Sequence, residues 1–541
     1  MRLCCSPFPV YPHIKSIAFR SKTITGVELF EPLCFPEPSA AKSSVQQMGQ
    51  MYSALSAFYL PTALSCKPHL LIFQGMGYTD NKLREADLTV PRLKGYFMQA
   101  KREKYGLITS ITMIIGICIG SGIFFKSDNV LAATGGSVPL GILVFAIAAI
   151  SIVFGGLAVS ELASRTDKPG GIIAYSEEFV SRRFACCIGW FQTLVYYPAL
   201  IAVVSWVIGV YSCILFAIPA SFPVQLAIGV GFYAASYLLN TFAPKAGGAM
   251  QNITTLLKLV PLVVIAVLGL AFGDPLRGIS QTAPAQLQTA GWLSAIGPVA
   301  FSYDGWIVST SISHEIRDAK RNLPKALVLA PLLVMLVYIL YFTGVASLLP
   351  ANEIIVLGDD HVAAIARNLL GDMGARVILI FIIISVVGTV NGLVLGFIRQ
   401  PYSLALDGKL FPGSKRLALI HPKWNMPLAS SLLAFCLCLF WSAAHYFTHS
   451  FDFLPNSDVS EISIALNYLL YTVLYAQVFR LYRRGLIKSR WRGVIVPLFA
   501  FLGSLIVLLG SLQNALFPLY AGFCLLVILA AFLYYQKRHR E

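Results

Sequence analysis

Twelve apolar runs, each long enough to cross a lipid bilayer, constrain this chain more than any other feature. A transmembrane helix needs about 20 predominantly apolar residues. The third run is longer, which predicts strong tilt or extension beyond the bilayer. The runs lie at residues 107–125, 138–163, 184–216, 222–243, 246–272, 291–313, 326–350, 377–398, 426–447, 462–479, 493–513 and 517–536. We therefore expect an all-α integral membrane protein with twelve transmembrane helices.

The composition excludes a soluble protein. Hydrophobic residues make up 57% of the 541-residue chain and charged residues only 12%, whereas soluble domains have about 45–50% and about 25%. The net charge of +16 could suggest a nucleic-acid partner. The basic residues, however, lie between apolar runs that are too long for a soluble DNA-binding fold. We expect the chain to lie in a lipid bilayer and to bind no nucleic acid.

The distribution of basic residues predicts the orientation of the chain, because lysine and arginine are enriched in cytoplasmic connections. One set of segments, which includes both ends of the helical core, contains twenty-eight of the 41 lysines and arginines. The alternate connections contain four, which are Lys126, Arg277, Arg367 and Arg376. We expect a multi-pass protein of the plasma membrane with both termini in the cytoplasm.

Residues 1–97 differ from the rest of the chain. Most of this segment is rich in Pro, Ser and Cys, and it contains neither an uninterrupted apolar span nor a clear signal peptide. Two interpretations stay open: a disordered cytoplasmic tail, or upstream sequence that is foreign to the working protein. Met98, shortly before the first apolar run, resembles a natural start. The eleven cysteines of the chain show no zinc spacing, and we expect no metal and no cofactor.

Two glycine-containing interruptions lie in the middle of apolar runs, one at Ile119 to Phe124 and one at Phe301 to Trp306. Broken backbone at membrane depth is tolerated only where it is buried in protein or lines a cavity. The free N–H groups of the first break and the positive end of the half-helix that follows suit a carboxylate. Close packing of helices through small residues is the alternative.

Interruptions at corresponding positions of two five-helix halves indicate an inverted-repeat transporter. The halves would be residues 98–272 and 273–479, and residues 480–541 would add two helices and the cytoplasmic C-terminus. The halves share no useful sequence identity, so the repeat is inferred from the paired interruptions.

Only two ionisable side chains lie deep in the apolar runs, Lys258 and Asp304. Such residues are functional candidates. Lys258 could hold the carbonyls of an unwound helix in place of a cation, or carry a proton, or extend to the cytoplasmic interface near Lys245. Asp304 could have a functional role or could cap a helix at the break.

Asn391 could be a substrate or gating contact or form an interhelical hydrogen bond. Tyr196, in the third run, is interpreted as a packing residue.

These features resemble the amino acid–polyamine–organocation superfamily, and within it the L-type amino acid transporters and bacterial serine/threonine exchangers. The resemblance extends to cytoplasmic motifs and covers roughly residues 100–535, outside the N-terminal extension. Those motifs include Pro169-Gly170-Gly171, Arg321-Asn322-Leu323-Pro324 and Asp407-Gly408-Lys409-Leu410-Phe411-Pro412.

The resemblance implies a LeuT-type fold, a 5+5 inverted repeat with discontinuous first and sixth helices, which moves amino acids by alternating access. It implies that the first break binds the substrate carboxylate, that carbonyls of the second take the ammonium group, and that Phe301 closes over the substrate. Lys258 stands where sodium-coupled relatives bind an ion, which implies sodium independence. The implied substrate-binding residues are Ile119, Gly120, Ser121, Gly122, Ile123, Phe301, Ser302 and Tyr303, and the coupling or gating residues are Lys258, Asp304 and Asn391.

Eukaryotic L-type members pair with a glycoprotein through a cysteine in the outer loop after the third helix. The corresponding loop here, near Ala217 to Phe222, contains no cysteine, and Cys213 is the nearest. We therefore expect no glycoprotein heavy chain.

The leading hypothesis is a secondary transporter of neutral L-amino acids that works by exchange or proton coupling. The lack of an acidic cluster favours neutral substrates. A membrane enzyme would need histidines, paired carboxylates or a metal cluster in mid-span, and none of the eight histidines lies there. A transport-incompetent amino acid sensor on the same fold stays open.

Overall fold

The computed structural model divides into two compact units, Met1–Gln99 and Ala100–Glu541. In the first unit the described residues form an antiparallel strand pair, β1 (Phe19–Ile24) and β2 (Val27–Pro32). The two interpretations of residues 1–97 otherwise lie outside the described residues. The structure describes residues 19–24, 27–32 and 106–540, without 126, 167, 169, 276–289, 407, 409, 452, 454–457 and 513–515.

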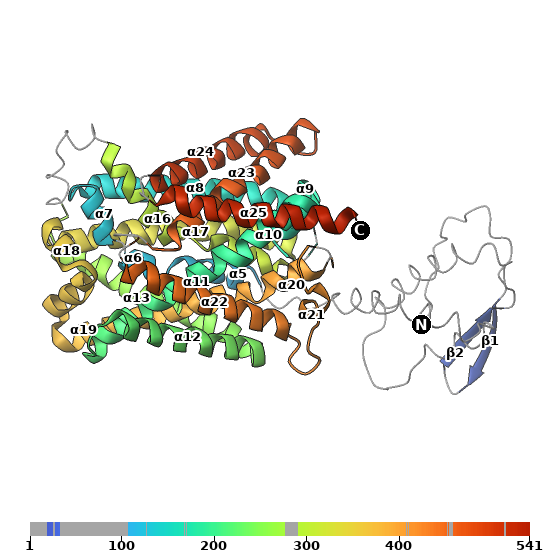
Figure 1. Ribbon diagram of the computed structural model, residues 1–541, viewed down its shortest axis with the longest axis horizontal. Coiled ribbons are helices and arrows are strands. Elements are labelled where there is room, and N and C mark those ends of the chain that lie inside the picture. Colours follow the sequence, from blue (N-terminus) through green and yellow to red (C-terminus); the bar gives the residue numbers. More distant parts are fainter. Residues whose placement is uncertain are drawn as a thin grey trace, which may run out of the picture. The chain divides into compact units, whose positions relative to one another are not determined.

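The second unit is built from helices that lie side by side (Figure 1). Its first half contains α5 (Leu107–Cys118), α6 (Ser121–Phe125), α7 (Ser127–Ala133), α8 (Val138–Ala163), α9 (Ile172–Phe179), α10 (Arg182–Phe191), the π-helix η2 (Gln192–Tyr196), α11 (Tyr197–Phe216), α12 (Phe222–Phe242) and α13 (Pro244–Phe272). Next come the 3-10 helix η3 (Ala290–Ala295), α16 (Ile296–Tyr303), the 3-10 helix η4 (Trp306–Glu315), α17 (Ala319–Leu348), α18 (Ala351–Leu357), the 3-10 helix η5 (Gly358–Asp360) and α19 (His361–Phe397). The chain ends with α20 (Arg399–Leu406), α21 (Ser414–Leu417), α22 (Leu428–Ser450), α23 (Glu461–Arg483), the π-helix η6 (Trp491–Ile495), α24 (Val496–Ser511) and α25 (Phe517–Arg540).

The expected helical membrane architecture is confirmed. Among the described residues, ten helices are long and apolar enough to cross a bilayer, and a further pair, Ser110–Phe124 and Ser127–Ala133 bent by 58°, would make eleven. The remaining expected span, the sixth, is divided into η3, α16 and η4, none of which is long enough alone. The predicted polar interruption accounts for the boundary between α16 and η4.

Helices that lie far apart in the sequence pack together in this unit: α8 against α17, α11 against α19, and α6 against α16. Small residues permit the close approach. A Cβ atom added to Gly156 of α8 would lie 2.3 Å from the carbonyl oxygen of Leu327 on α17. Glycine therefore brings these two backbones together, as it does in membrane helix pairs generally. The packing places both interruptions inside the bundle.

Candidate functional site

The first apolar run is interrupted between α5 and α6. Helix α5 ends at Cys118, and Ile119 adopts an extended conformation with φ −76° and ψ 99°. The last carbonyls of a helix have no partner within it, and they form the negative end of its dipole. The end of α5 therefore presents, in the interior of the protein, carbonyl oxygens that have no partner within the helix.

The ammonium group of Lys258, on α13, donates hydrogen bonds to carbonyls at this end of α5. Its Nζ atom is 2.5 Å from the Gly116 oxygen, 2.6 Å from the Ile119 oxygen and 3.1 Å from Thr389 Oγ1. An ammonium group has three hydrogen-bond donors, so each donor has a partner. The side chain is fully buried and does not extend to the interface. Lys258 thus joins α13, the end of α5 and α19.

The second interruption follows α16, which ends with the three predicted residues Phe301, Ser302 and Tyr303. Gly305 has a φ of +90°, a conformation that side chains with a Cβ atom rarely adopt. The chain then continues as the 3-10 helix η4. A glycine is therefore needed at the point where this span changes from one helical geometry to another.

The two interruptions are in direct contact. A Cβ atom added to Gly122 would lie 2.4 Å from the Cα atom of Ser302. The hydroxyl oxygen of Tyr338, on α17, is 2.8 Å from the carbonyl oxygens of both Cys118 and Ser302. One tyrosine therefore contacts the backbone of both interruptions.

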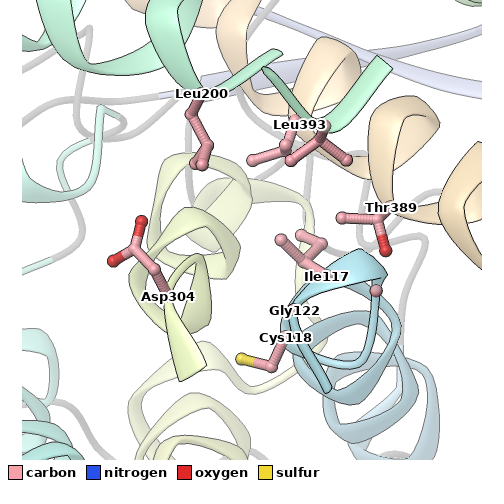
Figure 2. Close-up of a pocket in the computed structure, with 9 residues that line it drawn as sticks. Ile117, Cys118, Gly122, Leu200, Asp304, Thr389 and Leu393 are labelled. Carbon is pink, nitrogen blue, oxygen red and sulfur yellow. The ribbon is translucent and has the colours of Figure 1, made fainter. Parts of the chain in front are cut away.

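A small cavity of about 20 Å³ lies between the interruptions, α11 and α19 (Figure 2). Its apolar walls include Ile117, Leu200 and Leu393, and the polar groups of Asp304 and Thr389 lie on opposite sides of it in this view. Sites for small molecules are typically apolar hollows of about 300–1,000 Å³ with a few placed polar groups. The cavity has this apolar lining with a few polar groups, but its volume is far below that range.

The carboxylate of Asp304 is held by the third span. The hydroxyl of Tyr196 donates to Asp304 Oδ2 at 2.5 Å, and both residues are buried. Tyr196 ends the π-helical segment η2. The interpretation of Tyr196 as a packing residue was therefore incomplete, because its ring packs in the core while its hydroxyl contacts a candidate site residue.

Asn391, on α19, forms interhelical hydrogen bonds. Its Nδ2 atom donates to the Gly247 carbonyl and to Gln251 Oε1, both at 3.1 Å, and its Oδ1 atom accepts from Asn240 Nδ2 at 2.7 Å. These contacts join α19 to α12 and α13. Asn391 does not line the described cavity.

The structure thus brings the backbones of the predicted first-break residues next to Ser302. Ile119, Gly122, Ile123, Ser302 and Tyr303 are buried. A Cβ atom added to Gly120 would lie 2.5 Å from Thr389 Oγ1. The side chains of Ser121 and Phe301 lie outside the described residues.

Sequence reasoning did not identify Tyr338 or Thr389 as site residues. Neither carries a charge, and neither lies in an interruption. Each has a polar group in the middle of an apolar run, which could have pointed to a role in the site. Many other tyrosines and threonines of the chain share this feature, so it does not single these two out.

Comparison with known proteins gives one consistent result. The amino acid permease family model matches residues 105–535. The chain is 30% identical over 450 residues to the serine/threonine exchanger SteT of Bacillus subtilis, covering 81% of this chain and 98% of the relative. It is 28% identical over 465 residues to the b(0,+)-type amino acid transporter 1 of Mus musculus (80% and 87%). It is 27% identical over 390 residues to the human cystine/glutamate transporter (69% and 74%).

Proposed function

The chain belongs to the amino acid permease family, and we propose that it is a secondary active transporter that moves neutral L-amino acids across the plasma membrane by alternating access. One observation carries the proposal: the interruptions of the first and sixth runs meet beside a cavity. The residues Gly120 to Ile123 offer backbone N–H groups for a substrate carboxylate. The carbonyls of Phe301 to Tyr303 offer acceptors for its ammonium group.

We also propose twelve spans in two inverted halves. The divided segment from η3 to η4 would be the sixth crossing and the bent segment from α5 to α7 the first. A pseudo-two-fold axis through the bundle would bring equivalent helices together. The packing of α8 on α17 and of α11 on α19, each pair five expected spans apart, supports this arrangement.

The contacts of Lys258 support sodium-independent transport. Its ammonium group occupies the oxygens that a cation at the end of α5 would need. Exchange or proton coupling would then drive accumulation. Sodium replacement during uptake tests this part of the proposal, because a requirement for sodium would contradict it.

The cavity supports a neutral substrate, since its described walls are mostly apolar and its carboxylate, Asp304, accepts a hydrogen bond from Tyr196. A competition panel of the twenty amino acids against a transported substrate would test this class. Stronger competition by cationic than by neutral amino acids would overturn it.

We propose that no glycoprotein subunit is attached after the third span. The connection between α11 and α12 contains no cysteine, and Cys213 is buried in α11. Purification from native membranes under non-reducing conditions tests this, because a disulfide-linked partner would appear as a larger species.

Counterflow in proteoliposomes tests the function itself. Vesicles preloaded with a neutral amino acid should take up the labelled amino acid without sodium and without an energy source. If binding occurs but no amino acid drives uptake under any gradient, the sensor alternative replaces the transporter.

A further inference from the structure

The connection between α23 and η6 concentrates positive charge. Residues 480–492, which we call the basic turn, contain six arginines and lysines and no acidic residue. The six, all with exposed side chains, are Arg480, Arg483, Arg484, Lys488, Arg490 and Arg492. The helices on either side are long and apolar enough to cross a bilayer, and they pack against each other (Figure 1). The basic turn therefore lies where these two helices meet the membrane surface.

The backbone of the basic turn has a defined conformation. Gly485 has a φ of +74°, and its N–H donates to the Tyr482 carbonyl at 2.9 Å. The N–H of Leu486 donates to the Leu481 carbonyl at 3.1 Å. These two bonds form the Schellman pattern that ends many helices. Ile487, which follows, is buried. The charges are therefore carried on a compact turn rather than along an extended segment.

Five of the six charges form no ion pair with another described residue. The exception is Arg492, whose Nη1 atom lies 3.4 Å from Glu161 Oε1 on α8. The number of basic residues is enough to orient a chain in a membrane, but orientation does not require them to share one turn without counter-charge. Unpaired positive charge at a membrane surface attracts anionic lipids. The planar guanidinium group of arginine also matches the oxygens of a phosphate.

Two large apolar side chains are exposed within the basic turn. Leu486 is 62% exposed and Trp491 is 53% exposed. The ring of Trp491 also packs against Phe154 on α8, with ring centres 6.2 Å apart, so its position is fixed. Tryptophan is enriched at the level of the lipid headgroups. Apolar groups beside unpaired arginines fit a phospholipid better than a soluble anion, because a soluble anion offers them nothing to contact.

We propose that the basic turn is a binding site for the phosphate headgroup of an anionic phospholipid, with Leu486 and Trp491 in contact with its acyl chains. The bound lipid would hold the adjoining ends of α23 and α24 at the membrane surface. Because Trp491 and Arg492 contact α8, the lipid would also stabilise the packing of α24 on α8. The inference needs a chain embedded in a membrane but no transport, so it is independent of the proposed function.

Lipid binding to the full-length protein in a non-ionic detergent tests the inference. Phosphatidylglycerol with a fluorophore on one acyl chain is the probe, and its anisotropy gives the dissociation constant. Each basic residue near an anionic lipid contributes about fivefold in affinity. The triple variant Arg483→Gln, Arg484→Gln, Arg490→Gln should therefore bind this lipid at least about tenfold more weakly. If the triple variant does not fold, Arg484→Gln alone should weaken binding about fivefold.

The matched control removes the same charge from another predicted cytoplasmic connection, with Arg317→Gln, Arg321→Gln and Lys325→Gln. These three side chains are exposed, but no large apolar side chain is exposed between the described residues 317 and 328. The control should bind phosphatidylglycerol as the wild type does. An equal loss in both triple variants would mean that net charge alone attracts the lipid, and it would overturn a site at the basic turn.

Three comparisons distinguish a phospholipid from other anions. Labelled phosphatidylcholine should bind the wild type at least about tenfold more weakly than phosphatidylglycerol. Binding of phosphatidylglycerol should weaken between about 0.1 M and about 1 M NaCl, because the Debye length falls from about 10 Å to about 3 Å. Trp491→Ala should weaken it several-fold. Equal affinity for both lipids, binding that is independent of salt, or complete displacement of phosphatidylglycerol by inorganic phosphate would each overturn the inference.

Discussion

The Nζ atom of Lys258 lies 2.6 Å from the carbonyl oxygen of Ile119, so a side chain of α13 satisfies the backbone where α5 ends. A positive charge at this end of a helix is favourable because the helix dipole is negative there. Since the charge belongs to the chain, it cannot dissociate as a bound ion can. The conformation of the first interruption should therefore be independent of external sodium.

Replacement of Lys258 should abolish exchange. In Lys258→Ala the carbonyls of Gly116 and Ile119 lose their charged donor, and one buried charged hydrogen bond contributes about 1.5–3 kcal/mol. We expect counterflow to fall at least about tenfold, with normal membrane insertion. Lys258→Met, which keeps more of the volume, should behave in the same way.

The control for this prediction is Lys245→Ala, since Lys245 is exposed near the start of the same helix. Its exchange should match the wild type. Near-wild-type exchange in Lys258→Ala and Lys258→Met would show that the lysine is dispensable.

A methyl group at Gly122 should prevent substrate binding. The added Cβ would lie 2.4 Å from the Ser302 Cα atom, which is backbone and cannot rotate away. Gly122→Ala should therefore separate the interruptions and raise the dissociation constant at least about tenfold, as measured with a radiolabelled amino acid on purified protein. Gly231→Ala on α12 is the control, because nothing lies within 4 Å of its added Cβ. Retained binding in Gly122→Ala would place the site elsewhere.

Features encoded in consecutive residues were predictable from the sequence. Helix α8 has the bounds of the second apolar run, and the interruptions lie at Gly120 and Gly305, as their glycines indicated. Both features follow from local physics: apolar length sets a span, and glycine permits a backbone that departs from the helix. The sixth run was expected as one interrupted span, and the structure interrupts it between Tyr303, where α16 ends, and Trp306, where η4 begins.

Contacts between distant segments were not predictable. Tyr338 is 220 residues from Cys118, and Tyr196 is 108 residues from Asp304. Such pairs depend on how each helix is rotated about its axis, and an almost uniformly apolar run carries little information about rotation. Lys258 was singled out because a charge in an apolar run is costly, but the oxygens that it contacts emerged only from the structure.

Tyr196 and Asp304 should act as one unit. Tyr196→Phe and Asp304→Asn each remove part of the same buried hydrogen bond, so their effects on stability should not add. A double-mutant cycle on detergent-solubilised protein should give a coupling of about 0.5–3 kcal/mol. The cycle of Asp304→Asn with Tyr341→Phe should give none, because no hydrogen bond joins these described residues. A zero coupling for Tyr196 and Asp304 would mean that this bond does not contribute to the folded state.

Asn391 should affect stability more than substrate affinity. Its amide bonds to Asn240, Gly247 and Gln251, so Asn391→Val would leave buried polar groups without partners at a cost of about 1–3 kcal/mol. We expect a lower thermal midpoint and an unchanged KM for the fraction that remains folded. Asn352→Ala, at an exposed position of α18, should change neither. A several-fold higher KM at normal stability would make Asn391 a substrate contact.

The orientation of the chain can be tested at two exposed positions on opposite predicted sides. Met373 lies between Arg367 and Arg376, in a predicted outer connection, and Arg490 lies in the basic connection after α23; both are exposed. Because cytoplasmic connections collect lysine and arginine, a charged, impermeant maleimide should label Met373→Cys in intact cells. It should label Arg490→Cys only after the membrane is permeabilised.

The unsubstituted protein gives the background labelling of the native cysteines. The reverse pattern would invert the predicted topology and place the basic connections outside the cell.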